Sequence, residues 1–198
     1  DELIDSGADA FYFGYSFNDE ANSSTAECID DKSSKDCVNT NNQFGLADSL
    51  LSRRAGECNF ENLSDAINAL SYIRSRNRQV YITFNEHFYP ESYYEQILKD
   101  MKSLVDNCVD GFIITDIALM SNVSQKFPDV TLVASTGCNI TNENSIDFYK
   151  QFGISKIVLP RSLSPARMIE IASRHPEMEF EIFIKNEKCP NVDGFCDY

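Results

Sequence analysis

The feature that most restricts the fold of this chain is a regular alternation of two kinds of segment. From residue 59 onward, stretches with helical apolar spacing alternate with short runs rich in β-branched and aromatic residues. Strands are predicted at 10–14, 80–84, 111–115, 131–134, 156–159 and 180–184. Helices are predicted near 61–77, 91–107, 116–127, 141–152 and 164–175. Strand–helix units repeated at roughly 25–30 residues predict an α/β fold whose parallel strands are joined by right-handed crossovers.

Two architectures fit this alternation, an open doubly wound sheet and a closed eight-unit (β/α) barrel. No Gly-x-Gly-x-x-Gly follows any predicted strand, which weakens the dinucleotide-binding form of the open sheet. We therefore expect an α/β fold of the TIM-barrel type. Six strands are too few for a complete barrel, so we expect a first strand before residue 1 and the rest of the C-terminal part after residue 198.

The expected single domain spans residues 1–198, and one stretch within it breaks the regularity. Residues 15–58 are rich in Asn, Ser and Asp and contain few apolar residues before 44–51. Structureless connections longer than about 15 residues are usually functional or disordered. We interpret 15–58 as a polar insertion loop with a short helix at 45–53. Its two candidate roles are a mobile lid and a partly disordered decoration.

A formal net charge of −14 limits the partners of this chain. Such a field repels phosphate backbones and anionic membranes, which argues against bulk nucleic-acid binding. No run approaches the roughly 20 apolar residues of a membrane span. The seven cysteines, an odd number spread along the chain, favour a reducing compartment. We expect a cytoplasmic protein that takes a small-molecule or protein-presented substrate and that could pair with a related subunit.

Polar and titratable side chains follow most of the predicted strands. Because parallel α/β proteins bind ligands at the carboxyl ends of their strands, these side chains are the candidate site residues. Asp116 and His87 are the expected catalytic pair, an acid and a base for proton transfer. Substrate binding is expected from Asn85, Ser135, Thr136, Arg161 and Lys185. The alternative role of Asp116 is to cap the next helix, and that of Arg161 is to pair with a neighbouring acid.

Familiar catalytic motifs are missing from the sequence. Neither His-Glu-x-x-His nor Gly-x-Ser-x-Gly occurs. The second histidine, His175, precedes Pro176 at a predicted helix end and is expected at the surface. With His87 as the one well-placed histidine, a catalytic zinc site with three protein ligands is not expected. A nucleophile–base pair of Cys138 and His87 stays open, although no spacing supports it.

Short motifs along most of the chain are similar to those of the collagenase-like peptidase family U32. They are Gly7-Ala8-Asp9-Ala10 through Phe13-Gly14, Arg54-Ala55, Asn59-Phe60, Val80-Tyr81-Ile82-Thr83 with Asn85, Ala134-Ser135-Thr136, Asn139-Ile140-Thr141-Asn142, Val158-Leu159-Pro160-Arg161, Leu163-Ser164, Glu181-x-Phe183 and Cys189-x4-Gly194-x-Cys196. The last resembles the family's signature. The likeness covers nearly the whole chain apart from 15–52.

This resemblance implies a fold, a cofactor and an activity. The fold is an incomplete or modified TIM-type barrel. Some members of the family are called peptidases, with no settled catalytic type, and others are oxygen-independent hydroxylation proteins acting on RNA or a quinone precursor. In the latter, cysteines that include the signature pair hold a [4Fe-4S] cluster. The resemblance thus assigns Cys189 and Cys196 as two cluster ligands, and a cubane needs four.

The chain also departs from the family pattern at two places. Lys185-Asn186-Glu187-Lys188 stands where the family has His-Gly, Ser or Ala and an aliphatic residue, and Gly137 stands where the family usually has Gln. Three functions therefore remain in view. They are an iron–sulfur-dependent hydroxylation enzyme acting on a small molecule or an RNA base, a peptidase of unassigned catalytic type, and a non-catalytic barrel with a binding role.

Overall fold

The computed structural model describes residues 2–15 and 59–184. Its strands are β1 (Ala10–Tyr15), β2 (Asn59–Phe60), β3 (Gln79–Phe84), β4 (Gly111–Ile114), β5 (Thr131–Ala134), β6 (Lys156–Val158) and β7 (Glu179–Glu181). Its α-helices are α1 (Glu2–Asp5), α2 (Leu63–Ser75), α3 (Tyr94–Asp106), α4 (Ile117–Lys126), α5 (Glu143–Lys150) and α6 (Pro165–Arg174), and 3₁₀ turns form η2 (Glu91–Tyr93) and η3 (Thr136–Cys138). Nearly all of the expected insertion, with the expected helix at 45–53, lies outside the described residues.

The strands form one parallel sheet in the order β2-β1-β3-β4-β5-β6-β7. From β1 to β7 the order follows the chain, apart from β2, which pairs with the outer edge of β1. A doubly wound sheet can have the same order, with its second strand outside the first, so strand order alone leaves both predicted architectures open. Within the described residues the sheet is open, with β2 and β7 at its edges.

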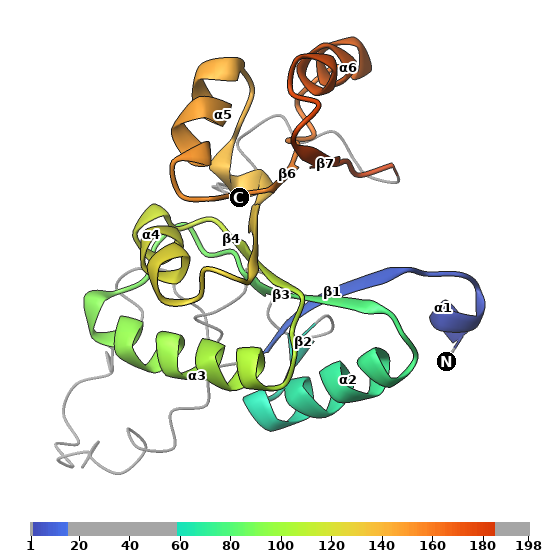
Figure 1. Cartoon of the computed structure of the whole chain (residues 1–198), viewed down its shortest axis with the longest axis vertical. Helices are drawn as coiled ribbons and strands as arrows, with labels where there is room; N and C mark the ends of the chain where they lie inside the picture. The colour runs from blue at the N-terminus through green and yellow to red at the C-terminus, as the bar shows by residue number, and fades with distance from the viewer. Residues whose placement is uncertain (1, 16–58, 185–198) are drawn as a thin grey trace, which may run out of the picture.

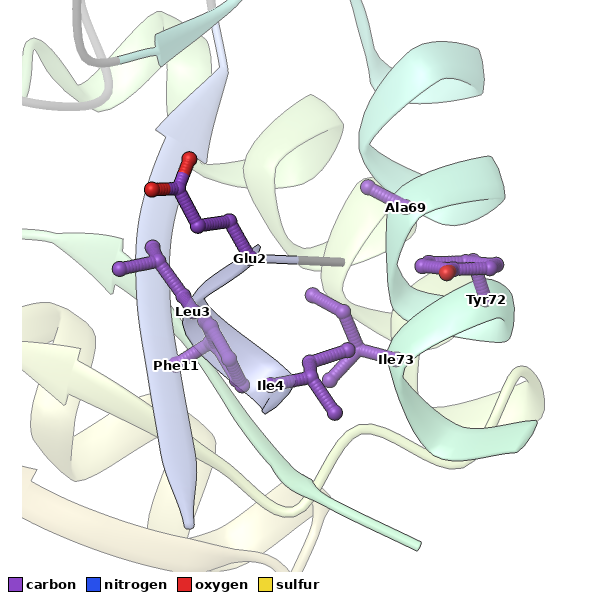
Figure 2. A pocket seen from close by; sticks show the side chains of 7 residues that line it. All are labelled: Glu2, Leu3, Ile4, Phe11, Ala69, Tyr72 and Ile73. Carbon is purple, nitrogen blue, oxygen red and sulfur yellow. The ribbon is translucent and has the colours of Figure 1, made fainter. Parts of the chain in front are cut away.

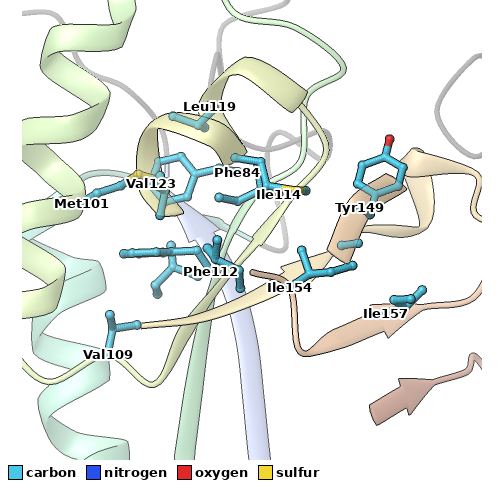
Figure 3. Close-up of a cluster of buried hydrophobic side chains, with 14 of the residues drawn as sticks. Phe84, Met101, Val109, Phe112, Ile114, Leu119, Val123, Tyr149, Ile154 and Ile157 are labelled. Carbon is cyan, nitrogen blue, oxygen red and sulfur yellow. The ribbon is translucent and has the colours of Figure 1, made fainter. Parts of the chain in front are cut away.

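The main core lies between one face of the sheet and the helices (Figure 3). The side chains of β3 and β4 that face this core alternate along each strand, as Val80, Ile82 and Phe84 do in β3. All five long helices contribute to the same cluster, and Figure 1 shows them following one another along the sheet from α2 to α6. In α3, for example, Ile97, Met101 and Leu104 recur at helical spacing and are fully buried. The helices therefore cover one common face.

The opposite face of the sheet has its own small buried cluster, formed by Tyr81, Ile113, Val133 and Val158. The ammonium of Lys156 lies 4.8 Å from the centroid of the Tyr81 ring, so β3 and β6 are linked across two intervening strands. In (β/α) barrels, the alternate residues of each strand that face away from the helices form the barrel interior in the same way.

Most helices begin at a side-chain cap that the sequence makes readable. Asn62, Asp116, Asn142 and Ser164 each accept a hydrogen bond from a backbone N–H in the first turn of their helices. Pro165 directly after Ser164 occupies the first helical position, as expected. Each of these helices therefore begins at its cap, after the carboxyl end of the preceding strand.

The six predicted strands and five predicted helices are confirmed, with ends that move by a few residues. The last strand is shorter than expected, because β7 stops at Glu181 rather than continuing to 184. The expected surface position of His175 is wrong, since its side chain is buried with Nδ1 3.3 Å from Glu177 Oε1. Among the described residues, no helix is long and apolar enough to cross a membrane.

Candidate functional site

The carboxyl ends of β3, β4 and β5 lie level with one another. Phe84 pairs with Ile114, and Ile114 pairs with Ala134. The next residue of each strand is therefore Asn85, Thr115 or Ser135, and the three chains leave the sheet side by side. This edge holds most of the residues that the sequence predicts for the site.

Asp116 follows β4 and is buried, with 6% of its surface exposed. Its Oδ1 accepts hydrogen bonds from the backbone N–H of Leu119 at 2.7 Å and from the hydroxyl of Tyr94 at 2.8 Å. Its Oδ2 accepts one from the backbone N–H of Tyr89 at 3.2 Å. The helix-capping alternative is thus confirmed, and the same carboxylate also fastens the segment between β3 and α3.

Tyr94 and Tyr89 share the environment of this carboxylate. Burial, followed by the hydrogen bond to Asp116, raises the pKa of Tyr94. Burial also raises the pKa of Tyr89, whose hydroxyl accepts from the backbone N–H of Glu86 at 3.3 Å. The two rings meet edge to face with centroids 6.5 Å apart. Both phenols therefore stay protonated, and they link the 86–94 segment to Asp116 and to the backbone of Glu86.

Asn85 and His87 come together with Thr115 and Gly137 at the centre of this edge. The Thr115 hydroxyl donates to the backbone carbonyl of Asn85 at 3.2 Å. A Cβ placed on Gly137 would lie 3.1 Å from Cε1 of the His87 ring and 2.9 Å from Cγ2 of Thr115. The half-buried imidazole thus packs directly over the start of η3. Three loops from three neighbouring strands meet at this point.

Ser135 and Thr136 follow β5 and form the start of η3. Ser135 is buried, and its hydroxyl accepts from the backbone N–H of Gly137 at 3.4 Å. Thr136 is half-buried in the first position of the turn. Both are placed at the edge that the sequence predicts, with Ser135 shaping the turn.

Cys138 ends η3 and is a protonated thiol. Its Sγ donates toward the backbone carbonyls of Ile114 at 3.5 Å and Thr115 at 3.7 Å. Burial raises the pKa of Cys138 to about 12. A thiol attacks as its thiolate, so this cysteine is poorly suited to the role of a nucleophile.

Arg161 follows β6, and its guanidinium lies 5.9 Å from the centroid of the Phe183 ring. A cation–π contact of this kind helps to hold the guanidinium in place at the carboxyl end of β6. Lys185, Cys189 and Cys196, the other predicted binding and metal residues, lie outside the described residues.

Tyr15 ends β1, but it points to the helix side of the sheet. Its hydroxyl donates to Oδ2 of Asp100 in α3 at 3.1 Å, and Gln96 donates to Oδ1 of the same carboxylate at 2.7 Å. Burial, the largest effect, raises the pKa of Asp100, although these two hydrogen bonds partly offset it. Tyr15 therefore belongs to the core beside α3 and not to the candidate site.

The residues described here offer no ready metal site. Across 2–15 and 59–184, no group of three or more His, Cys, Asp or Glu side chains could hold a metal ion. Cys108 is exposed and lies between α3 and β4, at the amino-terminal edge of the sheet. The five other cysteines of the chain, which include Cys189 and Cys196, fall outside these ranges.

The described part of the chain also has an apolar groove of about 310 Å³, whose lining side chains are drawn in Figure 2. It is formed by α1, the start of β1 and the last turns of α2, and it is lined by Glu2, Leu3, Ile4, Phe11, Ala69, Tyr72 and Ile73. Because α2 runs back from the carboxyl end of the sheet, its last turns lie at the amino-terminal edge. The groove therefore contains none of the predicted site residues.

Three contributors to this site were missed in the sequence. Thr115 was placed inside a predicted strand, Gly137 was noted only as a departure from the family pattern, and Tyr94 was placed inside a predicted helix. Knowledge of the strand register would have identified Thr115, because Thr115 and Asn85 each follow one residue of the Phe84–Ile114 pair. No local pattern marks Tyr94 as a partner of Asp116.

Comparison with known proteins identifies the family to which this sequence is similar. The model of peptidase family U32 matches residues 1–198. Escherichia coli tRNA hydroxylation protein P is 29% identical over 143 residues, which cover 72% of this chain and 31% of that protein. The uncharacterized protease MJ0090 of Methanocaldococcus jannaschii is 27% identical over 154 residues, or 74% of this chain and 36% of that protein. This chain thus spans about a third of the length of these relatives.

A solved structure supports the fold. The U32 peptidase Mk0906 aligns with a TM-score of 0.50 and 15% sequence identity, over 63% of this chain and 52% of that chain. At this level of identity the likeness is one of fold alone.

Proposed function

This chain belongs to peptidase family U32, and on that premise we propose that it is part of an oxygen-independent hydroxylation enzyme that acts on a small molecule or an RNA base. The observation that carries the proposal is the similarity to tRNA hydroxylation protein P in Escherichia coli and Haemophilus influenzae, each 29% identical over 143 residues. The matched stretch is long enough to include the strand ends described above.

We further propose that the open sheet is part of a TIM-type barrel. Strands β3 to β7 follow chain order and the five long helices lie on one face of the sheet, as in such barrels. The likeness in fold to a U32 peptidase supports this architecture. In such barrels the reaction takes place at the carboxyl ends of the strands, where Asn85 and His87 lie.

The candidate residues divide into three roles. His87 is proposed to transfer a proton, since imidazole is the side chain best matched to neutral pH. Arg161, with Lys185, is proposed to bind an anionic group of the substrate. Asn85, Ser135 and Thr136 are proposed to line the substrate site. The catalytic role expected for Asp116 stays a prediction, and its three accepted hydrogen bonds favour a role in positioning.

A [4Fe-4S] cluster is the proposed cofactor, with Cys189 and Cys196 as two of its ligands. It would supply electron transfer to the site. Cys138 is not assigned to this ligand set, because across 2–15 and 59–184 it belongs to no group of three or more His, Cys, Asp or Glu side chains that could hold a metal ion. Cys108 lies at the opposite edge of the sheet. The remaining ligands would have to come from elsewhere in the full-length protein or from a partner such as a related subunit.

Charge guides the proposed choice of substrate. The chain carries a net charge of −14, which disfavours broad contact with an RNA backbone. The dense basic segment at 74–78 is partly neutralised, since Arg74 pairs with Asp110 at 2.8 Å and Arg78 pairs with Asp9 at 3.2 Å. We therefore propose a small molecule, or a base presented by another part of the protein, in a cytoplasmic setting.

The test uses the full-length protein purified without oxygen. Iron and acid-labile sulfide are measured, and the gene is expressed in a bacterial strain that lacks tRNA hydroxylation protein P, whose tRNA nucleosides are then analysed by mass spectrometry. About four irons per chain, lost in Cys189→Ser, together with restored hydroxylated nucleosides, would support the proposal. Iron-free protein that restores no hydroxylation would refute it.

A peptidase is the second candidate, favoured by the relative from Methanocaldococcus jannaschii that is named as an uncharacterized protease. Cys138 is a poor nucleophile at a pKa of about 12, and its Sγ donates toward the backbone carbonyls of Ile114 and Thr115. Digestion of gelatin by the same protein, unaffected by iron chelation, would favour this candidate over hydroxylation.

A further inference from the structure

We propose that Gly137 is the positioning residue of this site, because the absence of a side chain at 137 lets the loops after β3, β4 and β5 close together and seats the His87 imidazole beside Asn85. The placement stands on geometry alone, and its meaning for catalysis rests on the proposed function. Gly137 is buried and lies in η3, directly after the two expected substrate-binding residues of β5.

Space, and not backbone conformation, is the reason for a glycine here. The described glycines with positive φ are Gly7 and Gly153, and Gly137 is not among them. A Cβ at 137 would lie 2.9 Å from Cγ2 and 3.0 Å from Oγ1 of Thr115, and 3.1 Å from Cε1 of His87. Carbon–carbon contacts are optimal at roughly 3.5–4.0 Å, so any side chain would have to push its neighbours away.

Thr115 has little freedom to move aside. Its β-branched side chain is stiff at χ1, and its hydroxyl donates to the Asn85 carbonyl at 3.2 Å. The backbone of the same strand end is fixed by the N–H of Thr115, which donates to the carbonyl of Phe84 at 3.3 Å. Displacement of Thr115 would therefore be passed to Asn85, and through it to His87 two residues later.

His87 is seated by the same contact. Its Nε2 is buried, and its ring lies against the Cα of Gly137, so the ring spans from the loop after β3 to the turn after β5. Asp116 fixes the far end of this loop through the backbone N–H of Tyr89. Gly137 thus adjoins the imidazole ring, and Asp116 holds the backbone two residues beyond it.

The first test follows the histidine signals by NMR. Residues 1–198 contain two histidines, so in the ¹³C,¹⁵N-histidine-labelled full protein the signals missing from His87→Gln and from His175→Gln identify one site signal and one internal reference. In Gly137→Ala, the imidazole signals of His87 are expected to shift. Those of His175, buried beside Glu177 at the end of α6, are expected to stay in place. Unchanged His87 signals in folded Gly137→Ala would overturn the proposal.

The second test is a double-mutant cycle on urea unfolding. Thr115→Ala removes the two atoms that would lie closest to a Cβ at 137. The decrease in urea midpoint caused by Gly137→Ala should therefore be smaller by about half or more in the Thr115→Ala background. Gly153→Ala is the matched control. It places a side chain at φ 74° with nothing within 4 Å, so its cost comes from the backbone and should be the same with Thr or Ala at 115.

Loss of folding does not leave the proposal untested. Where Gly137→Ala alone does not fold, the pair with Thr115→Ala is expected to fold, and failure of both would overturn the steric argument. Absence of coupling would do the same. If the protein proves to lack hydroxylation activity, the NMR shift and the coupling still decide the placement of His87. Where activity is present, Gly137→Ala should lower it and alter its pH profile, whereas Gly153→Ala should do neither.

Discussion

Replacement of Asp116 by alanine should be among the most damaging single changes in the described part of this protein. The carboxylate is buried and accepts hydrogen bonds from Leu119, Tyr94 and Tyr89. A hydrogen bond to a charged group contributes about 1.5–3 kcal/mol, and loss of an N-cap alone costs about 1 kcal/mol. The bonds share one acceptor and are not additive, so we expect the free energy of unfolding to fall by about 3–5 kcal/mol.

The assay is urea unfolding followed by circular dichroism. With an m-value of about 2 kcal/mol/M, the midpoint of Asp116→Ala should fall by about 2 M. The urea midpoint of Asp116→Asn should lie between those of the unchanged protein and Asp116→Ala. Its side-chain oxygen can still accept from Leu119 and Tyr94, but its amide NH₂ faces the N–H of Tyr89. That leaves one buried donor without its acceptor, at a cost of about 1–3 kcal/mol.

An exposed cap supplies the control for this reasoning. Asn142 caps α5 by accepting from the backbone N–H of Ser145 at 3.0 Å, and it is exposed to solvent. Asn142→Ala should cost about 1 kcal/mol. If Asp116→Ala costs no more than Asn142→Ala at an unchanged m-value, the carboxylate does not hold the loop after β3, and the reasoning is refuted.

Two further predictions concern buried titratable groups. Because burial raises the pKa of Asp100, the folded state retains a proton that the unfolded chain has lost, and the free energy of unfolding should fall as pH rises just above the ordinary aspartate range. Asp100→Asn should flatten this dependence, and parallel midpoint–pH curves for the two proteins would contradict it. Iodoacetamide at neutral pH should alkylate exposed Cys108 in the native protein and spare Cys138, whose pKa is about 12, until unfolding. Peptide mass spectrometry reads both sites, and early labelling of Cys138 would show that the thiol is not buried.

Local patterns were enough to predict the order of strands and helices. The signals were strong because buried strands such as β3 and β4 are continuously apolar, and because caps such as Ser164 and Asn142 mark the helix starts. Composition failed at β7, where the apolar run continues through Ile184. The paired stretch of that strand ends at Glu181, opposite Val158, and the N–H of Leu159 donates to the carbonyl of Glu181 at 2.9 Å.

The candidate site was predicted as a set of positions and not as a set of contacts. The rule that ligands bind at strand ends identified Asn85, His87, Ser135 and Arg161 without knowledge of the register. The contact of Gly137 with His87 joins residues 50 apart and depends on which strands are neighbours. Such long-range contacts carry no sequence periodicity, so only the assembled sheet can reveal them.

Strand order that follows the chain also has a kinetic consequence. Paired residues in β6 and β7 are close along the chain: Lys156 and Glu179 are 23 residues apart. In contrast, Ala10 in β1 pairs with Gln79 in β3, which is 69 residues away. Loop-closure entropy grows as the logarithm of this separation, so joining β1 costs about 1 kcal/mol more than joining β7 to β6. We therefore expect the β3–β7 region to assemble first and β1 to dock late, with β1 amides exchanging with solvent deuterium faster than those of β4. The insertion that interrupts the regular repeat thus sets the order in which the molecule is built.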